Sequence, residues 1–231
     1  MARDTLTKLA RDTVACARCP RLRAWCARVA RERPPRFVAE DYWARPVPGF
    51  GDPRARLLIV GLAPGAHGSN RTGRPFTGDA SGVWLYEALH RFGFASQAAS
   101  TARDDGLRLD DCFITAVGRC APPGNKPAPR ELANCRPFLL RELTLLRRVR
   151  LVLALGKIAF DQYWAAAAEL GRPAPRPRPA FAHGVLVQPS GHPVPVLASY
   201  HPSRQNTNTG TLTRPMWHGI FRRARALLGG T

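Results

Sequence analysis

Three short apolar runs, each followed by a longer segment with helical periodicity, constrain the fold of this 231-residue chain most. The runs are residues 56–60, 112–117 and 151–155. Runs of this length are typical of strands that are buried on both faces. Their alternation with helices predicts an α/β fold in which helices cover both faces of a parallel sheet. Two further β segments are expected near residues 183–188 and 194–200.

The segments between and around these runs carry the spacing of amphipathic helices. Helices are expected at residues 5–15, from Pro20 onward, at 83–92, at 129–147, through Trp164, and from Thr213. Pro20 suits the first turn of its helix because no N–H partner is needed there. The chain contains no internal repeat and no convincing boundary, so residues 1–231 are expected to form a single domain.

The glycine-rich stretch at residues 61–82 links the first predicted strand to a helix. Its six glycines and two prolines favour a loop that bends tightly and approaches a ligand closely. The glycine spacing fits neither G-x-G-x-x-G nor G-x-x-x-x-G-K-[ST], which disfavours nucleotide binding. Within it lie a histidine, an aromatic ring and a carboxylate: His67, Phe76 and Asp79. The alternative interpretation is an ordinary long surface loop.

Two other loops leave predicted strands at the same edge of the sheet as the glycine-rich stretch. They are residues 120–126, which follow the second strand, and the loop that begins at His201. Ligands of parallel α/β sheets bind beyond the carboxyl ends of the strands. Three loops that are far apart in sequence are therefore expected to converge on one site.

The formal net charge of +19 indicates a polyanionic partner. Nearly all of the basic residues are arginines, because only Lys8, Lys126 and Lys157 are lysines. Arginine pairs with phosphate through two parallel hydrogen bonds, which favours a nucleic acid. Compositional drift in a GC-rich genome is an alternative source of the arginines. No stretch resembles a signal peptide or a membrane span, so a soluble, cytoplasmic protein without a membrane partner is expected.

Four of the six cysteines have a spacing that favours metal binding in a reducing compartment. Cys16 and Cys19 form a C-x-x-C pair, and Cys120 and Cys135 supply two more thiols. Four thiolates suffice for Zn²⁺ or for a [4Fe–4S] cluster. A second C-x-x-C pair, usual in zinc ribbons, is missing, which favours iron and sulfur over zinc. Buried, unliganded thiols are the alternative, and Cys26 and Cys112 are assigned to the core because they lie in apolar patterns.

Taken together, these motifs resemble the uracil-DNA glycosylase superfamily, in particular its iron-sulfur members of the branch called family five. The motifs are Cys16-x-x-Cys19-Pro20, Gly61-Leu-Ala-Pro-Gly65, Arg71-Thr-Gly-Arg-Pro-Phe76-Thr-Gly-Asp79, Cys120-Ala-Pro-Pro, Cys135 and His201-Pro-Ser203. The resemblance implies a three-layer α/β/α sandwich around a four-stranded parallel sheet. It further implies a [4Fe–4S] cluster on Cys16, Cys19, Cys120 and Cys135 that staples an N-terminal helical extension to the body.

The activity implied by the resemblance is the excision of deaminated bases from DNA by a monomeric enzyme. The damaged base must leave the helical stack before its N-glycosidic bond is accessible. Phe76 suits a stacking platform for this base, with an ordinary core aromatic as the alternative. Other contacts to the base are expected from Gly61, Leu62, Ala63 and Ala116.

Three side chains are candidates for the chemistry of bond cleavage. His201 is expected to donate a hydrogen bond to O2 of the departing base, helped by backbone N–H groups around Leu62 to Pro64. Asp79 is expected to position water and stabilise the sugar cation, with Asn125 assisting. A helix N-cap is the competing role for Asp79, because a helix is predicted to begin just after it.

The chain departs from the family pattern at two places. Many relatives place an acidic or amide residue next to the first glycine of the first motif, where this chain has Leu62 and Ala63. That departure strengthens the case for Asp79. The sister iron-sulfur branch uses an asparagine four residues before the third cysteine to read uracil, and here the residue is Ala116. We therefore expect relaxed selectivity that includes hypoxanthine and xanthine.

Contacts to DNA are expected from Arg71 and from the loop after His201. The residues of that loop are Ser203, Arg204, Gln205 and Asn206. Two other function classes remain open, a non-catalytic nucleic-acid-binding protein with a metal and a redox protein that uses the cluster. A pure binding protein needs neither Asp79 nor His201, and the chain contains no flavin or nicotinamide motif, which disfavours the redox alternative.

Overall fold

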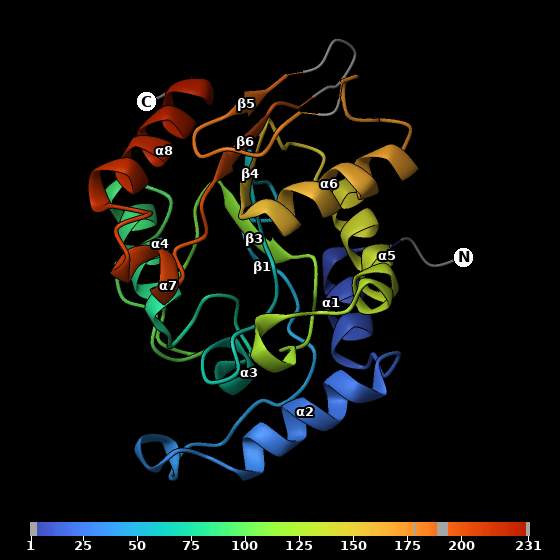
Figure 1. The fold of residues 1–231 in the computed structure, drawn as a ribbon, viewed down its shortest axis with the longest axis vertical. Helices are drawn as coiled ribbons and strands as arrows, with labels where there is room; N and C mark the ends of the chain where they lie inside the picture. The colour runs from blue at the N-terminus through green and yellow to red at the C-terminus, as the bar shows by residue number, and fades with distance from the viewer. Residues whose placement is uncertain (1–3, 178, 189–193, 230–231) are drawn as a thin grey trace.

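The computed structural model describes residues 4–177, 179–188 and 194–229, and its centre is one mixed β-sheet (Figure 1). The strand order is β1-β3-β2-β4-β6-β5. The inner strands β2 (Leu57–Gly61), β3 (Cys112–Ala116), β4 (Leu151–Leu155) and β6 (Val196–Ser199) pair in parallel. They correspond to the apolar runs of the sequence, and nearly all of their residues are buried.

The prediction of a four-stranded, purely parallel sheet is incomplete. Two strands of two residues each, β1 (Phe50–Gly51) and β5 (Leu186–Val187), add antiparallel edges to β3 and β6. Both come from segments that turn back on their neighbour, β1 after the proline-rich crossing and β5 in a hairpin-like return. The β segment expected at 183–188 contains β5, but strands this short carry no alternation of apolar and polar residues that would indicate an antiparallel edge.

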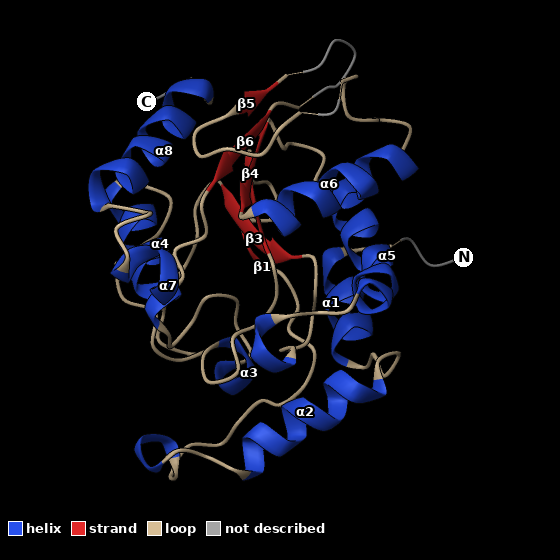
Figure 2. Ribbon diagram, viewed as in Figure 1, coloured by secondary structure: helices blue, strands red, loops and turns tan. Residues whose placement is uncertain are grey.

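Helices cover the two faces of the sheet, as the alternating pattern predicts (Figure 2). Helices α4 (Ala80–Arg91) and α8 (Arg214–Leu227) lie on one face, where a core forms around Leu85, Leu89 and Trp217. Helices α5 (Pro129–Leu145) and α6 (Lys157–Glu169) lie on the other face, where a second core forms around Phe160 and Trp164. Within the described part of the chain, no helix is both long and apolar enough to cross a membrane.

The N-terminal helices α1 (Leu6–Val14) and α2 (Pro20–Arg31) attach to the body through α5. Arg141 of α5 forms ion pairs with Asp4 and Asp12, which frame α1. Arg21 of α2 binds both carboxylate oxygens of Glu131, at 2.8 and 2.7 Å. The helical extension predicted for the N-terminus is therefore present, and arginine–carboxylate pairs hold it against the body.

The register of the inner strands brings the ends of neighbouring strands together. Gly61 at the end of β2 pairs with Ala116 at the end of β3, and Leu155 of β4 pairs with Ser199 of β6. The three loops singled out in the sequence leave the sheet at this edge. Short helices form within them: α3 (Ser69–Thr72), the 3₁₀ turn η2 (Pro123–Asn125) and α7 (Arg204–Asn208).

Candidate active site

A cavity of about 720 Å³ opens at the carboxyl edge of the sheet, and all three loops line it. Asp79, Phe76, Asn125 and His201 contribute to its wall. The expected convergence of distant loops is therefore confirmed. The prediction rests on topology alone, because parallel strands present all of their carboxyl ends at one edge of a sheet.

Asp79 both caps a helix and lines the cavity, so the two roles considered for it coexist. Its Oδ1 accepts a hydrogen bond from the backbone N–H of Gly82 at 3.0 Å, which makes it the N-cap of α4. Its other oxygen, Oδ2, faces the turns at Gly65 and Gly68. One oxygen thus fixes the carboxylate while the other is directed at the glycine-rich wall of the cavity.

The glycines opposite Asp79 leave room for its carboxylate. A Cβ atom at Gly65 would lie 2.7 Å from Asp79 Oδ2, and a Cβ atom at Gly68 would overlap the same oxygen. Any larger residue at Gly68 must therefore displace the carboxylate or the loop. These two glycines are needed for close approach, as the composition of the stretch suggests.

Burial raises the pKa of Asp79 above its ordinary value. The backbone N–H groups of Gly82 and Ser81 and the positive charges of Arg204 and Arg71 act in the opposite direction. Among the described residues, no arginine or lysine lies within ion-pair distance of this carboxylate. An enclosed carboxylate without a paired cation is a candidate for a catalytic role, because structural carboxylates are normally paired.

His201 stacks on Phe76 in the wall of the cavity. The ring centroids are 5.7 Å apart and the planes differ by 28°. Burial lowers the pKa of His201 to about 4. The imidazole is therefore neutral near pH 7, and a neutral imidazole has one N–H group that is able to donate a hydrogen bond.

Phe76 packs tightly against the end of strand β2. A Cβ atom at Gly61 would lie 2.9 Å from the Phe76 ring, so only glycine permits this contact. The Phe76 backbone has a φ of 52°, and its N–H donates to Ser69 Oγ at 3.0 Å. A left-handed phenylalanine is uncommon and is found where the surrounding structure imposes it.

Asn125 and the first turn of the glycine-rich stretch complete the polar lining. Asn125 also has a left-handed backbone, with a φ of 57°, and its side chain is exposed at the cavity. Leu62, Ala63 and Ala116 line the cavity as well. Because Pro64 has no N–H group, only Leu62 and Ala63 of this turn are able to donate backbone hydrogen bonds to a ligand.

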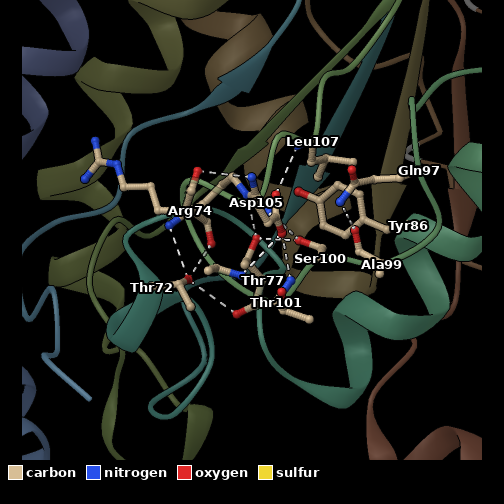
Figure 3. Close-up of polar contacts among 12 residues, drawn as sticks. Thr72, Arg74, Thr77, Tyr86, Gln97, Ala99, Ser100, Thr101, Asp105 and Leu107 are labelled. Carbon is tan, nitrogen blue, oxygen red and sulfur yellow. Dashed lines mark hydrogen bonds and ion pairs between the residues drawn. The ribbon is translucent and has the colours of Figure 1, made fainter. Parts of the chain in front are cut away.

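A buried polar network holds the glycine-rich stretch from behind (Figure 3). Arg74 forms an ion pair with Asp105 at 2.7 Å and hydrogen bonds with Thr77 Oγ1 and Ser100 Oγ at 2.9 Å. Tyr86 donates its hydroxyl to the carbonyl of Pro75 at 2.8 Å. These contacts flank Phe76 on both sides in the sequence, so the network fixes the aromatic ring in the cavity wall.

Similarity to known proteins identifies the family of this chain. Residues 48–224 match the profile of the uracil DNA glycosylase superfamily. The chain belongs to the uracil DNA glycosylase superfamily. The matched region contains the sheet, most of the cavity lining and every candidate catalytic residue, and the family resemblance read from the sequence motifs is thereby confirmed.

Relatives of this glycosylase are similar over most of their length. The chain is 52% identical over 221 residues to a type-5 uracil-DNA glycosylase of Thermus thermophilus, covering 93% of this chain and 94% of that protein. It is 48% identical over 215 residues to a type-5 uracil-DNA glycosylase of Mycobacterium bovis, covering 93% and 78%. It is 46% identical over 217 residues to a type-5 uracil-DNA glycosylase of Pyrobaculum aerophilum, covering 94% and 90%.

The residues predicted to contact DNA divide into two groups in this glycosylase. Arg204 and Gln205 are exposed at the cavity. Ser203 instead caps α7 by accepting from the N–H of Asn206, and the Asn206 side chain donates to the His201 carbonyl at 2.8 Å. The latter two side chains hold the turn that carries His201, a role that a hydroxyl or amide in a short loop commonly takes.

Arg71 is buried, which differs from the position expected of a DNA contact. Its guanidinium forms an ion pair with Glu40 and donates to the carbonyls of His67 and Gly78. All of these partners belong to the protein, and the Arg71 side chain is only 8% exposed. The motif around Arg71 does not predict the ion pair with Glu40, because Glu40 lies 31 residues away in the chain.

Sequence reasoning missed three residues of the cavity wall. Arg36 and Phe37 come from the 3₁₀ turn η1 (Pro35–Phe37) in the segment that was expected only to cross to the first strand. Arg119 is buried beside Cys120 and donates to Glu142 Oε2 at 2.6 Å. No signal in the sequence pairs these residues with the glycine-rich stretch, since each partner is distant in the chain.

The four cysteines predicted to bind metal come from the segments that meet between α2, α5 and the loop after β3. None of the six cysteines forms a disulfide, and Cys19, Cys120 and Cys135 are buried. Burial raises the pKa of the Cys135 thiol, and the nearby thiols of Cys19 and Cys16 raise it further. Cys26 and Cys112 are fully buried; Cys112 lies in the core beside the sheet, whereas Cys26 lies in one cluster with Cys19 and Cys120.

The four cysteines suit an iron–sulfur cluster better than a single metal ion. Across residues 4–177, 179–188 and 194–229, no three His, Cys, Asp or Glu side chains come together as a set that could hold one metal ion. A [4Fe–4S] cluster takes one thiolate on each iron, so four cysteines supply the number of thiolates that it requires. Asn134 Nδ2 also donates to Cys19 Sγ at 3.4 Å, the type of contact that orients a thiolate ligand. The residues therefore fit the chemistry of a cluster.

Proposed function

We propose that this protein is a DNA repair glycosylase that hydrolyses the N-glycosidic bond of uracil in DNA, and that it also accepts hypoxanthine and xanthine. Family membership over most of the chain supports the action on uracil. The single observation that carries the mechanism is the unpaired, enclosed Asp79 carboxylate in the same cavity as the neutral His201. A protein that only binds DNA has no use for a carboxylate in its binding cavity that is enclosed without a paired cation.

In the proposed mechanism the extruded base stacks on Phe76, and His201 donates to O2 when the base is uracil. Breaking the bond leaves negative charge on the base and positive charge on the sugar. The neutral imidazole and the N–H groups of Leu62 and Ala63 stabilise the former. The Asp79 carboxylate stabilises the latter and orients the attacking water, with Asn125 as a second polar group for that water.

The wider base range follows from Ala116 at the end of β3. Its methyl group is half-buried at the cavity and offers no hydrogen bond to a base edge. A site that hydrogen-bonds a base edge rejects bases that cannot satisfy its groups, whereas an apolar site discriminates weakly. The cavity of about 720 Å³ also has room for a purine.

An excision assay tests this function. Purified protein is incubated with oligonucleotides that carry uracil, hypoxanthine or xanthine, and base release is followed by alkaline cleavage. We expect release from uracil and, at lower rates, from both purines. Release of uracil alone would restrict the base range, and binding without any release would favour the non-catalytic alternative.

Cys16, Cys19, Cys120 and Cys135 are the proposed ligands of a [4Fe–4S] cluster. The cluster supplies four Fe–S bonds that fasten α2 to the loop after β3 and to α5. Purified protein is expected to be brown, with broad absorption near ~400 nm and about four irons per chain. Cys135→Ser should lose iron, whereas Cys112→Ser, which alters a core thiol in another part of the molecule, should retain it. Stoichiometric zinc in a colourless, active preparation would contradict the proposal.

A single-domain, cytoplasmic monomer completes the proposal. One sheet is shared by both cores, which supports the single domain. Light scattering of the free protein and of its complex with a short duplex tests the monomeric state, and a dimer mass would contradict it.

A further inference from the structure

The turn η1 lies at the rim of the cavity and projects from the body of the protein. Figure 1 shows it as the light-blue turn at the lower left, beyond α3. Arg36 and Phe37 line the cavity, and Val38 at the end of the turn is 68% exposed. No other large apolar side chain in the described ranges is as exposed. The turn therefore places an exposed apolar side chain beside a basic side chain and an aromatic ring that line the cavity.

Contacts on its inner side anchor this turn to the glycine-rich stretch. The Arg71 guanidinium lies 4.2 Å from the centre of the Phe37 ring. Tyr42 Oη lies 2.9 Å from His67 Nδ1, and the backbone N–H of Trp43 donates to the Arg71 carbonyl at 2.8 Å. The base of the turn is therefore fixed to the residues that surround Asp79, while its tip is free to meet a ligand.

Three basic side chains from separate segments surround the mouth of the cavity. They are Arg36 of η1, Lys126 after η2 and Arg204 of α7, and all three are exposed. Within the described chain, none of them lies in an ion pair, and Asp79 is the one carboxylate of the lining. Positive groups at three sides of a concave site match a strand of DNA whose phosphates pass the mouth.

The acidic residues near η1 do not cancel the charge of Arg36. Glu40 is paired with Arg71, and Asp41 lies 3.6 Å from Arg33. Glu32 forms an i,i+4 pair with Arg28. Arg36 stacks over the ring of Phe37 at 4.8 Å, which holds its guanidinium at the rim without using its hydrogen-bond donors.

We propose that η1 is a second DNA-binding element, opposite α7, in which Arg36 contacts a backbone phosphate and Val38 packs against the base step next to the extruded nucleotide. The inference rests on the proposed glycosylase function. An apolar side chain that enters a base step helps to unstack it, which favours the extruded state of the target base in a duplex. In single-stranded DNA no paired partner remains to be displaced, so the contribution of Val38 is confined to the duplex.

Arg36→Ala tests the phosphate contact. Its affinity for a duplex with a tetrahydrofuran abasic analogue is measured from low to moderate salt. The slope of log affinity against log salt should become shallower by about 0.9, the value for one phosphate, and equally for different sequences. Arg148→Ala is the matched control, because Arg148 is exposed near the amino end of β4, at the opposite edge of the sheet. A slope that does not change for Arg36→Ala would overturn this part of the proposal.

Val38→Ser tests the apolar contact. Single-turnover excision of uracil is compared between duplex and single-stranded substrates, and the ratio of the two rates should fall by about tenfold. Leu227→Ser is the matched control, because Leu227 is 41% exposed at the far end of α8. Its rate ratio should equal that of the parental protein.

The outcomes separate the two proposals. If the parental protein releases no base, the glycosylase function fails. If it releases uracil and Val38→Ser leaves the ratio unchanged, or lowers both rates equally, the glycosylase function stands and the assignment of Val38 fails. Fluorescence of 2-aminopurine next to the uracil reports unstacking directly, and Val38→Ser should slow its rise in the duplex only.

Discussion

One carboxylate lies within the glycine-rich stretch and another lies behind it, and their surroundings are opposite. Asp105 lies behind the stretch, where it pairs with Arg74 and accepts from the backbone N–H groups of Thr101 and Leu107. Burial acts to raise its pKa, but these partners outweigh it and hold the pKa below the ordinary value. Asp79 lies in the cavity wall without a paired cation, and burial raises its pKa. The ionised aspartate is therefore favoured by its surroundings at Asp105 and disfavoured at Asp79.

The difference indicates a division of labour between the two regions. A carboxylate that is paired and hydrogen-bonded fixes the backbone around it. An enclosed carboxylate without a paired cation is able to stabilise a cation that forms in the site, such as the sugar in the transition state of bond cleavage. The scaffold at Asp105 and the site at Asp79 therefore respond differently to loss of the charge, and the predictions below use this contrast.

The largest effect is expected on the scaffold side. Asp105→Asn leaves the Arg74 guanidinium, which is 3% exposed, without its counter-charge. Breaking such a buried pair by changing one partner should lower the free energy of unfolding by about 3 kcal/mol. Chemical denaturation measures this, with Asp104→Asn as an exposed control of the same chemistry. An equal loss in the two variants would remove the distinction between scaffold and surface.

Asp79→Asn should have the opposite profile. The amide keeps the shape and the N-cap of α4, so stability should be equal to or higher than that of the parent. The rate of base release should fall by roughly 10²-fold, the scale of a positioned acid–base group. Single-turnover excision with saturating enzyme measures the rate, and a melting curve provides the control. A stable variant that cleaves at the parental rate would remove Asp79 from the mechanism.

Sequence reasoning identified the inner strands and the cavity loops for the same reason. Apolar runs such as 151–155 and loops such as the glycine-rich stretch are defined by neighbouring residues, which a sequence displays directly. Arg71 and Arg119 pair with residues that are distant in the chain, and Arg36 lines a cavity whose other walls are distant in the chain, so their positions emerge only in the folded protein. The edge strand β1 was missed, and the direction of β5 within the β segment expected at 183–188 was not identified, because two residues are too few for a periodic pattern.

Gly68→Ala tests whether the position of the Asp79 carboxylate matters in addition to its charge. A Cβ atom at Gly68 would overlap Asp79 Oδ2 and displace the carboxylate from its position. The rate of base release should fall roughly tenfold, less than for loss of the charge itself, because a displaced carboxylate retains part of its effect. Gly219→Ala is the control, since a Cβ atom there would contact nothing within 4 Å. Parental rates for Gly68→Ala would show that the orientation of Oδ2 is unimportant.

The smallest effects are expected in the pH dependence of stability, where the two carboxylates should act with opposite signs. Asp105 has a lowered pKa in the folded state, so its stabilisation is complete above the ordinary carboxyl pKa of about 3.9 and is lost as pH falls toward the folded pKa. The stability gap between the parent and Asp105→Asn should therefore narrow as pH falls below about 4. Asp79 has a raised pKa, so its contribution is complete below that ordinary pKa and is lost as pH rises through the folded pKa.

Relative to Asp79→Asn, the parent should therefore gain stability in acid and lose it toward neutral pH. His201 adds a term to the parent and to both variants alike, because its folded pKa of about 4 makes stability fall as pH drops from about 6.5. That shared term cancels when each variant is compared with the parent. Melting temperatures of the three proteins between pH 3 and 8 measure the two differences. If both differences change in the same direction with pH, Asp79 and Asp105 share one electrostatic environment and the contrast between site and scaffold is lost.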